Sequence, residues 1–130
     1  MQLYLLVALG GAIGSVLRFF FSHLIATHAG ETFPLGTLFV NVTGSFIIGF
    51  FGTLTGPEGR WFVPASGRQF FMTGICGGYT TFSSFSLNTL ALAQDEEWMR
   101  AGVNVAGSFT FCLLAVWLGH LLAARINQLR

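Results

Sequence analysis

Apolar residues form four long runs along the chain, and polar residues gather in the connections between them. Each run has roughly the ~20 residues that a helix needs to cross the hydrocarbon core of a bilayer. The runs cover about residues 3–25, 36–54, 69–93 and 102–124. This pattern predicts an all-α membrane protein with four transmembrane helices. Because little is left over for a soluble domain or a tail, we expect residues 1–130 to form one four-helix domain.

The connections agree with these boundaries. They cover residues 28–35, 55–67 and 94–101, and they hold all three prolines and all five acidic residues. Proline and clusters of polar residues both mark turns and loops. Turn chemistry and charge therefore divide the chain at the same places.

The third run is interrupted by residues that weaken a helix. Gly77 and Gly78 each cost roughly 1 kcal/mol relative to alanine, and the hydroxyl side chains in residues 80–86 can bond to backbone groups and stabilise a broken turn. One interpretation is a discontinuous membrane helix. Such a break survives in hydrocarbon only where protein or a water-lined cavity satisfies the freed backbone groups, so it tends to mark an ion or substrate site. The other interpretation is that small residues merely allow close packing.

Polar side chains recur at helical spacing in three of the runs. The sets, each on one helix face, are Thr37, Asn41 and Ser45; Thr81, Ser84 and Asn88; and Asn104, Ser108 and Cys112. Phe82 and Phe85 lie one position round the third helix as an i, i+3 pair. Such stripes either line a wet path or join helices by hydrogen bonds of about 0.6 kcal/mol. Three such stripes in so small a protein favour a water-lined path over a purely structural role.

Small residues four positions apart predict close helix contacts. The pairs are Gly10 and Gly14, Ser45 and Gly49, and Gly74 and Gly78. Four helices packed this closely leave little interior for a water-excluding pathway. We therefore expect an oligomer.

Composition narrows the function. The chain is 53% hydrophobic and only 8% charged, against about 25% charged in soluble domains, and its net charge of +1 gives no basic patch for nucleic acid. No Asp or Glu lies within any run, so a cation transporter has no carboxylate to bind its charge. Donors dominate instead: the amides of Asn41 and Asn104, the hydroxyls, and Arg18. Together with the electropositive ring edges of Phe82 and Phe85, this lining suits a small anion. We recognise no nucleophile, base and oxyanion-binding set, and expect no enzyme.

Four spans would place both termini on one side of the membrane, with connection 55–67. Arginines on that side outnumber those on the other by four to two. The four are Arg60, Arg68, Arg125 and Arg130, and the two are Arg100 and Arg18, which falls in the last two turns of the first run. The bias favours cytoplasmic termini. Because it is small, the chain can insert both ways and form an antiparallel dimer. We favour a homodimer over a heterodimer with an oppositely biased homologue.

Four motifs, in this order, resemble those of the Fluc (CrcB-type) fluoride channels. They are GGAIGSVLRF at 10–19, GTLFVN at 36–41, GGYTTFSSFS at 77–86 and VNVAGS at 103–108. The resemblance covers nearly the whole chain. It implies an antiparallel dual-topology dimer with two fluoride pores and a central sodium ion.

The resemblance also implies roles for particular residues. Phe82 and Phe85 would line fluoride positions, Asn41 would be a pore-entrance amide, and Ser108 and Thr37 would belong to a polar track. Thr81 and Ser84 complete the predicted pore set. The carbonyls of Gly77 and Thr80 would hold the structural sodium. Asn88 departs from the family, which commonly has Glu there.

These observations predict a passive fluoride-selective channel in the cell's inner (plasma) membrane. It would lower cytoplasmic fluoride by letting the anion leave after it has come in as HF. The alternative is a dual-topology exporter of organic cations of the small multidrug type. The lack of a carboxylate within the runs counts against the exporter.

Overall fold

The computed structural model describes residues 1–30 and 32–129. Glu31, in the first predicted connection, and Arg130, one of the arginines counted on the terminal side, lie outside the described residues. The described chain is built of helices and has no strand. In chain order the helices are α1 (Gln2–Ala29), α2 (Leu35–Leu54), α3 (Ala65–Gln69), the π-helix η1 (Phe70–Cys76), α4 (Gly77–Tyr79), α5 (Phe82–Gln94) and α6 (Trp98–Gln128).

Three of the described helices, α1, α2 and α6, are long and apolar enough to cross a membrane, judged by length and composition. They correspond to the first, second and fourth apolar runs. The third run is divided as the sequence predicts: α3, η1 and α4 follow one another without interruption, and two non-helical residues separate α4 from α5. With 13 residues, α5 is shorter than the ~20 that a full span requires. We call α3, η1, α4 and α5 together the divided helix.

Two predicted connections were too long. The divided helix begins at Ala65, directly after Pro64, and α6 begins at Trp98. Proline is well suited to the start of a helix because the first amides of a helix have no carbonyl partner within it. The divided helix therefore starts with a turn of small and polar residues ahead of its apolar stretch, and the first turn of α6 contains the charged Arg100. A pattern based on hydrophobicity does not include those turns.

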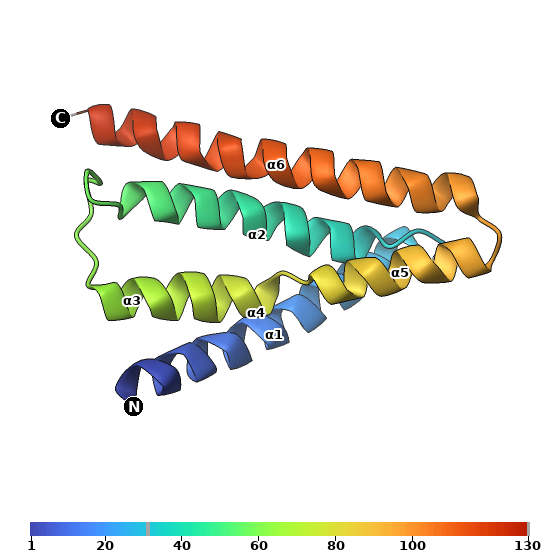
Figure 1. Cartoon of the computed structure of the whole chain (residues 1–130), viewed down its shortest axis with the longest axis horizontal. Coiled ribbons are helices and arrows are strands. Elements are labelled where there is room, and N and C mark those ends of the chain that lie inside the picture. Colours follow the sequence, from blue (N-terminus) through green and yellow to red (C-terminus); the bar gives the residue numbers. More distant parts are fainter. Residues whose placement is uncertain (31, 130) are drawn as a thin grey trace.

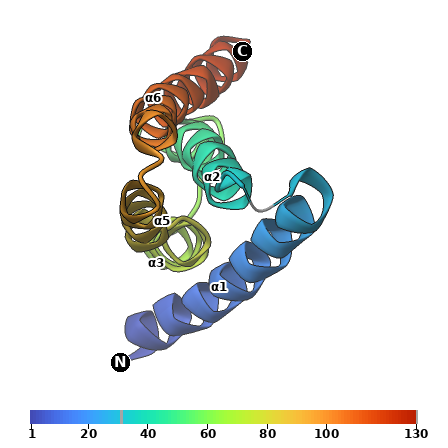
Figure 2. The same cartoon turned by 90° about the vertical axis from the view of Figure 1, so that its right-hand side faces the viewer.

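The helices run alternately along one long axis, and both termini lie at the same end of the molecule (Figure 1). Seen from the end, α2 lies between α6 on one side and α1 with the divided helix on the other (Figure 2). The helix α1 crosses obliquely past the divided helix, whereas α2 and α6 lie side by side in both views. The helix α2 thus has protein on two sides.

The contact between α1 and the divided helix is made through glycines. A Cβ atom on Gly10 would come 2.5 Å from the carbonyl oxygen of Phe70 and 2.9 Å from Cα of Gly74. One on Gly14 would come 2.8 Å from the amide nitrogen of Tyr79. These distances are shorter than any carbon side chain tolerates, so the backbones touch directly. The predicted packing role of the small-residue pairs is confirmed here.

The same principle joins α2 to α6. A Cβ on Gly49 would lie 2.9 Å from Cγ2 of Val116, and one on Gly119 would lie 2.9 Å from the amide nitrogen of Phe50. Arg68 adds a polar contact at the end of α2, where its guanidinium donates to the carbonyl of Thr55 and, at 2.6 Å, to its hydroxyl. A cation at a helix C-terminus complements the helix dipole.

Candidate functional site

The interruption of the divided helix lies at Thr80 and Thr81. Thr80 has φ −85° and ψ 157°, and Thr81 has φ −152° and ψ 111°, so both are extended. Gly77 and Gly78, which the sequence analysis placed at the break, are helical instead. The physical reason for Gly78 is contact rather than flexibility, because a Cβ there would lie 2.5 Å from the carbonyl oxygen of Gly11. The break was predicted correctly within this stretch of the third run, but the extended residues are the two threonines rather than the glycines.

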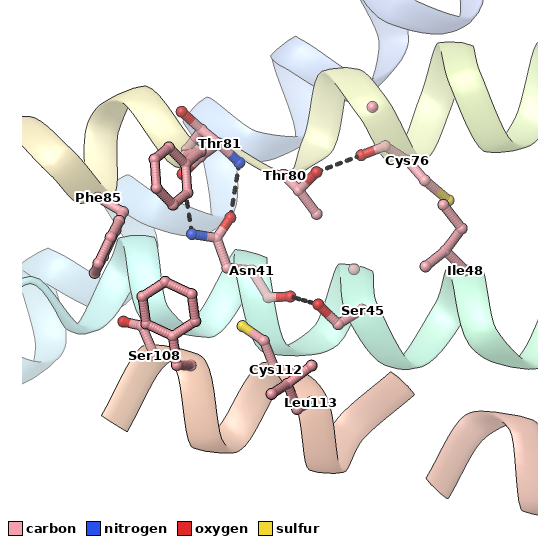
Figure 3. A pocket seen from close by; sticks show the side chains of 14 residues that line it. Asn41, Ser45, Ile48, Cys76, Thr80, Thr81, Phe85, Ser108, Cys112 and Leu113 are labelled. Carbon is pink, nitrogen blue, oxygen red and sulfur yellow. Dashed lines mark hydrogen bonds between the residues drawn. The ribbon is translucent and has the colours of Figure 1, made fainter. Parts of the chain in front are cut away.

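Asn41 of α2 satisfies the backbone of the break. Its Oδ1 accepts a hydrogen bond of 2.7 Å from the N–H of Thr81, and its Nδ2 donates one of 3.0 Å to the carbonyl of Thr81. Figure 3 shows both bonds. One side-chain amide therefore supplies the two partners that a neighbouring strand would give an extended residue. This is the protein contact that a break in a membrane helix requires.

Thr81 in turn begins α5. Its hydroxyl accepts a 3.1 Å hydrogen bond from the N–H of Ser84, which is the usual arrangement of a helix N-cap. The hydroxyl of Ser84 lies 3.0 Å from the same oxygen. Thr81 is itself buried. The two hydroxyls thus serve the start of the helix in this chain.

These bonds leave two carbonyls without their ordinary partners. In a continuous helix the carbonyl of Gly77 would accept from the N–H of Thr81, and that of Thr80 from the N–H of Ser84. Both amides are instead bound by side chains, at 2.7 Å and 3.1 Å. Unwound carbonyls and half-helix ends are the groups that coordinate sodium in discontinuous membrane helices. Gly77 and Thr80, the residues predicted to hold sodium, are among the residues at this helix end whose carbonyls lose their helical donors.

A pocket of about 320 Å³ lies against the break. It brings together five of the seven predicted pore residues, together with Gly77 and Thr80. The five are Asn41, Thr81, Phe82, Phe85 and Ser108. They come from α2, the divided helix and α6. Figure 3 shows the side chains of Asn41, Thr81, Phe85 and Ser108 around a common space. The pocket lining has no charged residue.

The aromatic pair forms one wall of this pocket. The ring centroids of Phe82 and Phe85 are 5.2 Å apart. Phe85 is buried, whereas Phe82 is 69% exposed in the single chain. Phe109 meets Phe85 at 6.0 Å with the planes at 89°. Sequence reasoning missed Phe109; the available signal was its place directly after Ser108.

Thr37 and Ser84 do not line the pocket. Thr37 lies toward the other end of α2, where the amide of Asn88 donates to its hydroxyl at 2.8 Å. Thr37 and Asn88 line a second pocket of about 630 Å³, with His23 and Arg100 among its other residues. The amide of Asn104 similarly donates to a hydroxyl of α5 at 2.8 Å. The amides of Asn41, Asn88 and Asn104 therefore all join helices, as the second interpretation of the stripes expects.

Comparison with known proteins gives the family. The family model described as CrcB-like protein, Camphor Resistance (CrcB), matches residues 5–120. The chain belongs to this family. The resemblance seen in the four sequence motifs is thereby confirmed. With three helices that are apolar and long enough to span, this member of the CrcB-like family is a multi-pass membrane protein.

Relatives named as fluoride-specific ion channels match over nearly the whole length. The fluoride-specific ion channel FluC of Opitutus terrae is 65% identical over 100% of this chain and 98% of its own. The channel of the same name from Paramagnetospirillum magneticum is 61% identical over 98% of this chain and 100% of its own. The channel of the same name from Rhodospirillum rubrum is 59% identical over 96% of this chain and 97% of its own.

Proposed function

We propose that the protein is a fluoride-selective channel that lets fluoride leave the cytoplasm passively across the plasma membrane. The names of its relatives support this proposal. The observation that carries it is the gathering of Phe82, Phe85, Asn41 and Ser108 around one uncharged pocket beside the break. The organic-cation exporter is not supported by these relatives, and no carboxylate lines the pocket.

The lining suits a small anion by its chemistry. Ring edges carry a positive partial charge, and Ser108 offers a hydroxyl donor. An uncharged wall lets an anion bind weakly enough to leave again, which conduction requires. Phe82 and Phe85 would supply the edges, and Asn41 would hold the break in the shape that places them.

We further propose that two copies assemble as an antiparallel, dual-topology homodimer. In each copy the divided helix would also cross the membrane, between α2 and α6 in the chain, which gives four spans in all. The exposure of Phe82, at 69%, supports a second copy on this side, because its own chain leaves most of the residue uncovered. The arginine bias between the two sides, four to two, is small and so compatible with insertion in both orientations.

A sodium ion at the centre of this dimer would be held by the carbonyls of Gly77 and Thr80 from both copies. Bound there, it would supply a fixed positive charge and tie the two breaks together. The fit is favourable because both carbonyls lack their helical donors and Gly77 is exposed. A hard cation bound by carbonyl oxygens needs no carboxylate.

The decisive test is Phe82→Ile, with Phe111→Ile as a matched control. Phe82 and Phe111 are both exposed helical phenylalanines, at 69% and 53%, and Phe111 lies outside the pocket. We expect Phe82→Ile to fold and to lose about fivefold in fluoride efflux from liposomes, since a ring contact contributes about 1 kcal/mol. Phe111→Ile should keep the wild-type rate. Wild-type fluoride flux in folded Phe82→Ile, or equal fluoride and chloride flux in the wild type, would overturn the proposal.

A further inference from the structure

The connection between α2 and α3 presents two aromatic side chains at the end of a membrane-spanning helix. Trp61 is 59% exposed and Phe62 is 92% exposed. The N–H of Trp61 donates to the carbonyl of Leu54, the last residue of α2, at 3.2 Å. With 20 residues, α2 is about as long as the hydrocarbon core of a bilayer is thick. The bond therefore places Trp61 at the boundary between hydrocarbon and headgroups, where tryptophan is enriched in membrane proteins.

Arg60 is held next to these two aromatic residues. Its N–H donates at 2.9 Å to Oδ1 of Asn127, in the last turn of α6, and Nδ2 of Asn127 donates at 3.2 Å to the carbonyl of Thr53 in α2. One side-chain amide thus ties the connection to two helices. The Arg60 side chain is exposed, and its one hydrogen bond within the described residues is a long one, 3.4 Å from Nη1 to the carbonyl of Leu129. Most of the five N–H donors of this guanidinium therefore face a group outside the chain.

The two ends of the molecule differ in charge. Among the described residues, the end with this connection, where both termini lie (Figure 1), has three arginines and one acid. They are Arg60, Arg68, Arg125 and Glu58. In the described part of the other end the proportion is reversed, with Asp95, Glu96, Glu97 and Arg100. That acidic end also has an exposed tryptophan, Trp98, at 70%. Two exposed tryptophans at opposite ends of the molecule thus have neighbours of opposite charge.

We propose that Arg60, Trp61 and Phe62 form a binding surface for an anionic phospholipid, with the headgroup phosphate on the guanidinium and the acyl chains along the two rings. A guanidinium matches a phosphate in geometry as well as in charge, because it can donate two parallel N–H bonds. The negative potential of a leaflet that contains anionic lipid attracts basic residues beside a span. Arg68 is not part of this surface, because its guanidinium is bound to Thr55 at the end of α2.

The test measures how strongly lipids with brominated acyl chains quench the fluorescence of a single tryptophan, which does not depend on transport. One protein keeps only Trp61, through Trp98→Phe and Trp117→Phe. It is reconstituted in mixtures of phosphatidylcholine and phosphatidylglycerol in which one lipid or the other is brominated. We expect phosphatidylglycerol to be enriched around Trp61 about fivefold over its share of the bilayer, since one arginine near an anionic surface has an effect of that size. A protein that keeps only Trp98 is the matched control and should show no enrichment.

Arg60→Gln separates the charge from the shape of the connection. The variant keeps the backbone N–H that binds Asn127, so the connection should stay in place while the enrichment around Trp61 falls to the bulk value. Arg60→Lys keeps the charge but lacks the planar pair of donors, and should keep part of the enrichment. Arg100→Gln removes an arginine at the other end and should leave the enrichment around Trp61 unchanged.

Four results would overturn the proposal. Quenching of Trp61 in proportion to the bulk share of each lipid would show that the surface does not select an anionic headgroup. Unchanged enrichment in Arg60→Gln would show that this arginine does not bind the phosphate. Equal enrichment around Trp98 would make lipid selection a property of the whole protein rather than of this surface. A Trp61 that neither brominated lipid quenches would show that a second copy of the chain covers the surface instead.

Discussion

The divided helix is contacted on two sides in two different ways. Against α1 it packs backbone on backbone, through Gly10 and Gly14. In the part of the chain that the structure describes, no side-chain hydrogen bond joins α1 to another helix. Against α2 the same helix is held by directed bonds, from Asn41 to the backbone of Thr81 and between the hydroxyls of Thr43 and Tyr79.

The difference shows what each kind of contact can control. The van der Waals repulsion between two atoms rises steeply when they overlap, so close backbone contact sets the distance between helices. It does not orient a peptide group. Hydrogen bonds have preferred directions. They also give partners to the backbone N–H and C=O groups of extended residues, which have no partner within a helix. The α1 face therefore places the divided helix, and the α2 face shapes its break. We expect changes on the first face to cost stability and changes on the second to cost transport.

The largest effect should come from Gly14→Ala on the α1 face. The new methyl group would meet the carbonyl oxygen of Ile75 and the amide of Tyr79, which are backbone atoms that cannot move aside. Overpacking costs about 1–3 kcal/mol and occasionally more, so we expect a loss of about 3 kcal/mol. A denaturant titration of the protein in detergent measures this loss in the free energy of unfolding.

Gly11→Ala is the control for that experiment. A Cβ at Gly11 would meet nothing within 4 Å, and alanine favours a helix by roughly 1 kcal/mol over glycine. The variant should be neutral or slightly more stable. If Gly11→Ala and Gly14→Ala destabilise the protein equally, close contact is not what the α1 glycines provide.

A smaller loss of stability, with a larger loss of transport, should follow Asn41→Leu on the α2 face. Leucine has a similar size but leaves the N–H and carbonyl of Thr81 unpaired, which costs about 1–3 kcal/mol for an orphaned buried group. We expect about 2 kcal/mol and at least a tenfold loss of fluoride flux per folded protein. Asn41→Asp keeps the acceptor and loses the donor, so its flux should be intermediate.

Ser45→Ala provides the comparison one turn away. Its hydroxyl donates to the carbonyl of Asn41 at 2.7 Å, within α2 itself. That carbonyl already belongs to the helix ladder, so the variant should lose less than about 0.5 kcal/mol. If flux per folded protein is unchanged in Asn41→Leu, the break can keep its shape without this amide, and the contrast between the two faces fails.

Much of the fold could be predicted from the sequence because bilayer thickness imposes a length on each helix. Four apolar runs were found, and the third was expected to be interrupted. The position of the interruption could not be predicted from propensity, since Gly78 weakens a helix in isolation but here allows contact with Gly11. The π-helix at Phe70–Cys76 leaves no recognised mark in the apolar pattern.

The sequence predicted which residues gather at the candidate site better than it predicted the hydrogen bonds and ring contacts between them. Periodicity placed Asn41, Phe85 and Ser108 on faces that meet at one pocket. It could not show that the amide of Asn41 hydrogen-bonds to the backbone of Thr81, because that bond depends on how α2 and the divided helix are offset along their axes. For the same reason neither Tyr79 with Thr43 nor Phe109 with Phe85 was foreseen.

A smaller effect than that of Asn41→Leu should come from Asn88→Glu, which tests whether the directed bonds extend to the far end of α2. At present the Asn88 amide donates to the Thr37 hydroxyl at 2.8 Å. A carboxylate can only accept, but the Thr37 hydroxyl can turn and donate to it. The bridge is therefore kept, and stability should change by less than about 1 kcal/mol.

Transport should respond to the new charge even though the bridge survives. Asn88 lines the pocket of about 630 Å³ that also contains Asp95 and Glu97, so a further carboxylate repels an approaching anion. At a few ångströms in water that repulsion is about 1 kcal/mol, or roughly a fivefold lower flux. The matched control is Asn88→Gln, which has the length of Glu without its charge and should conduct at the wild-type rate. Fluoride efflux normalised to reconstituted protein decides the matter, because equal rates for Asn88→Glu and Asn88→Gln place residue 88 outside the path of the ion.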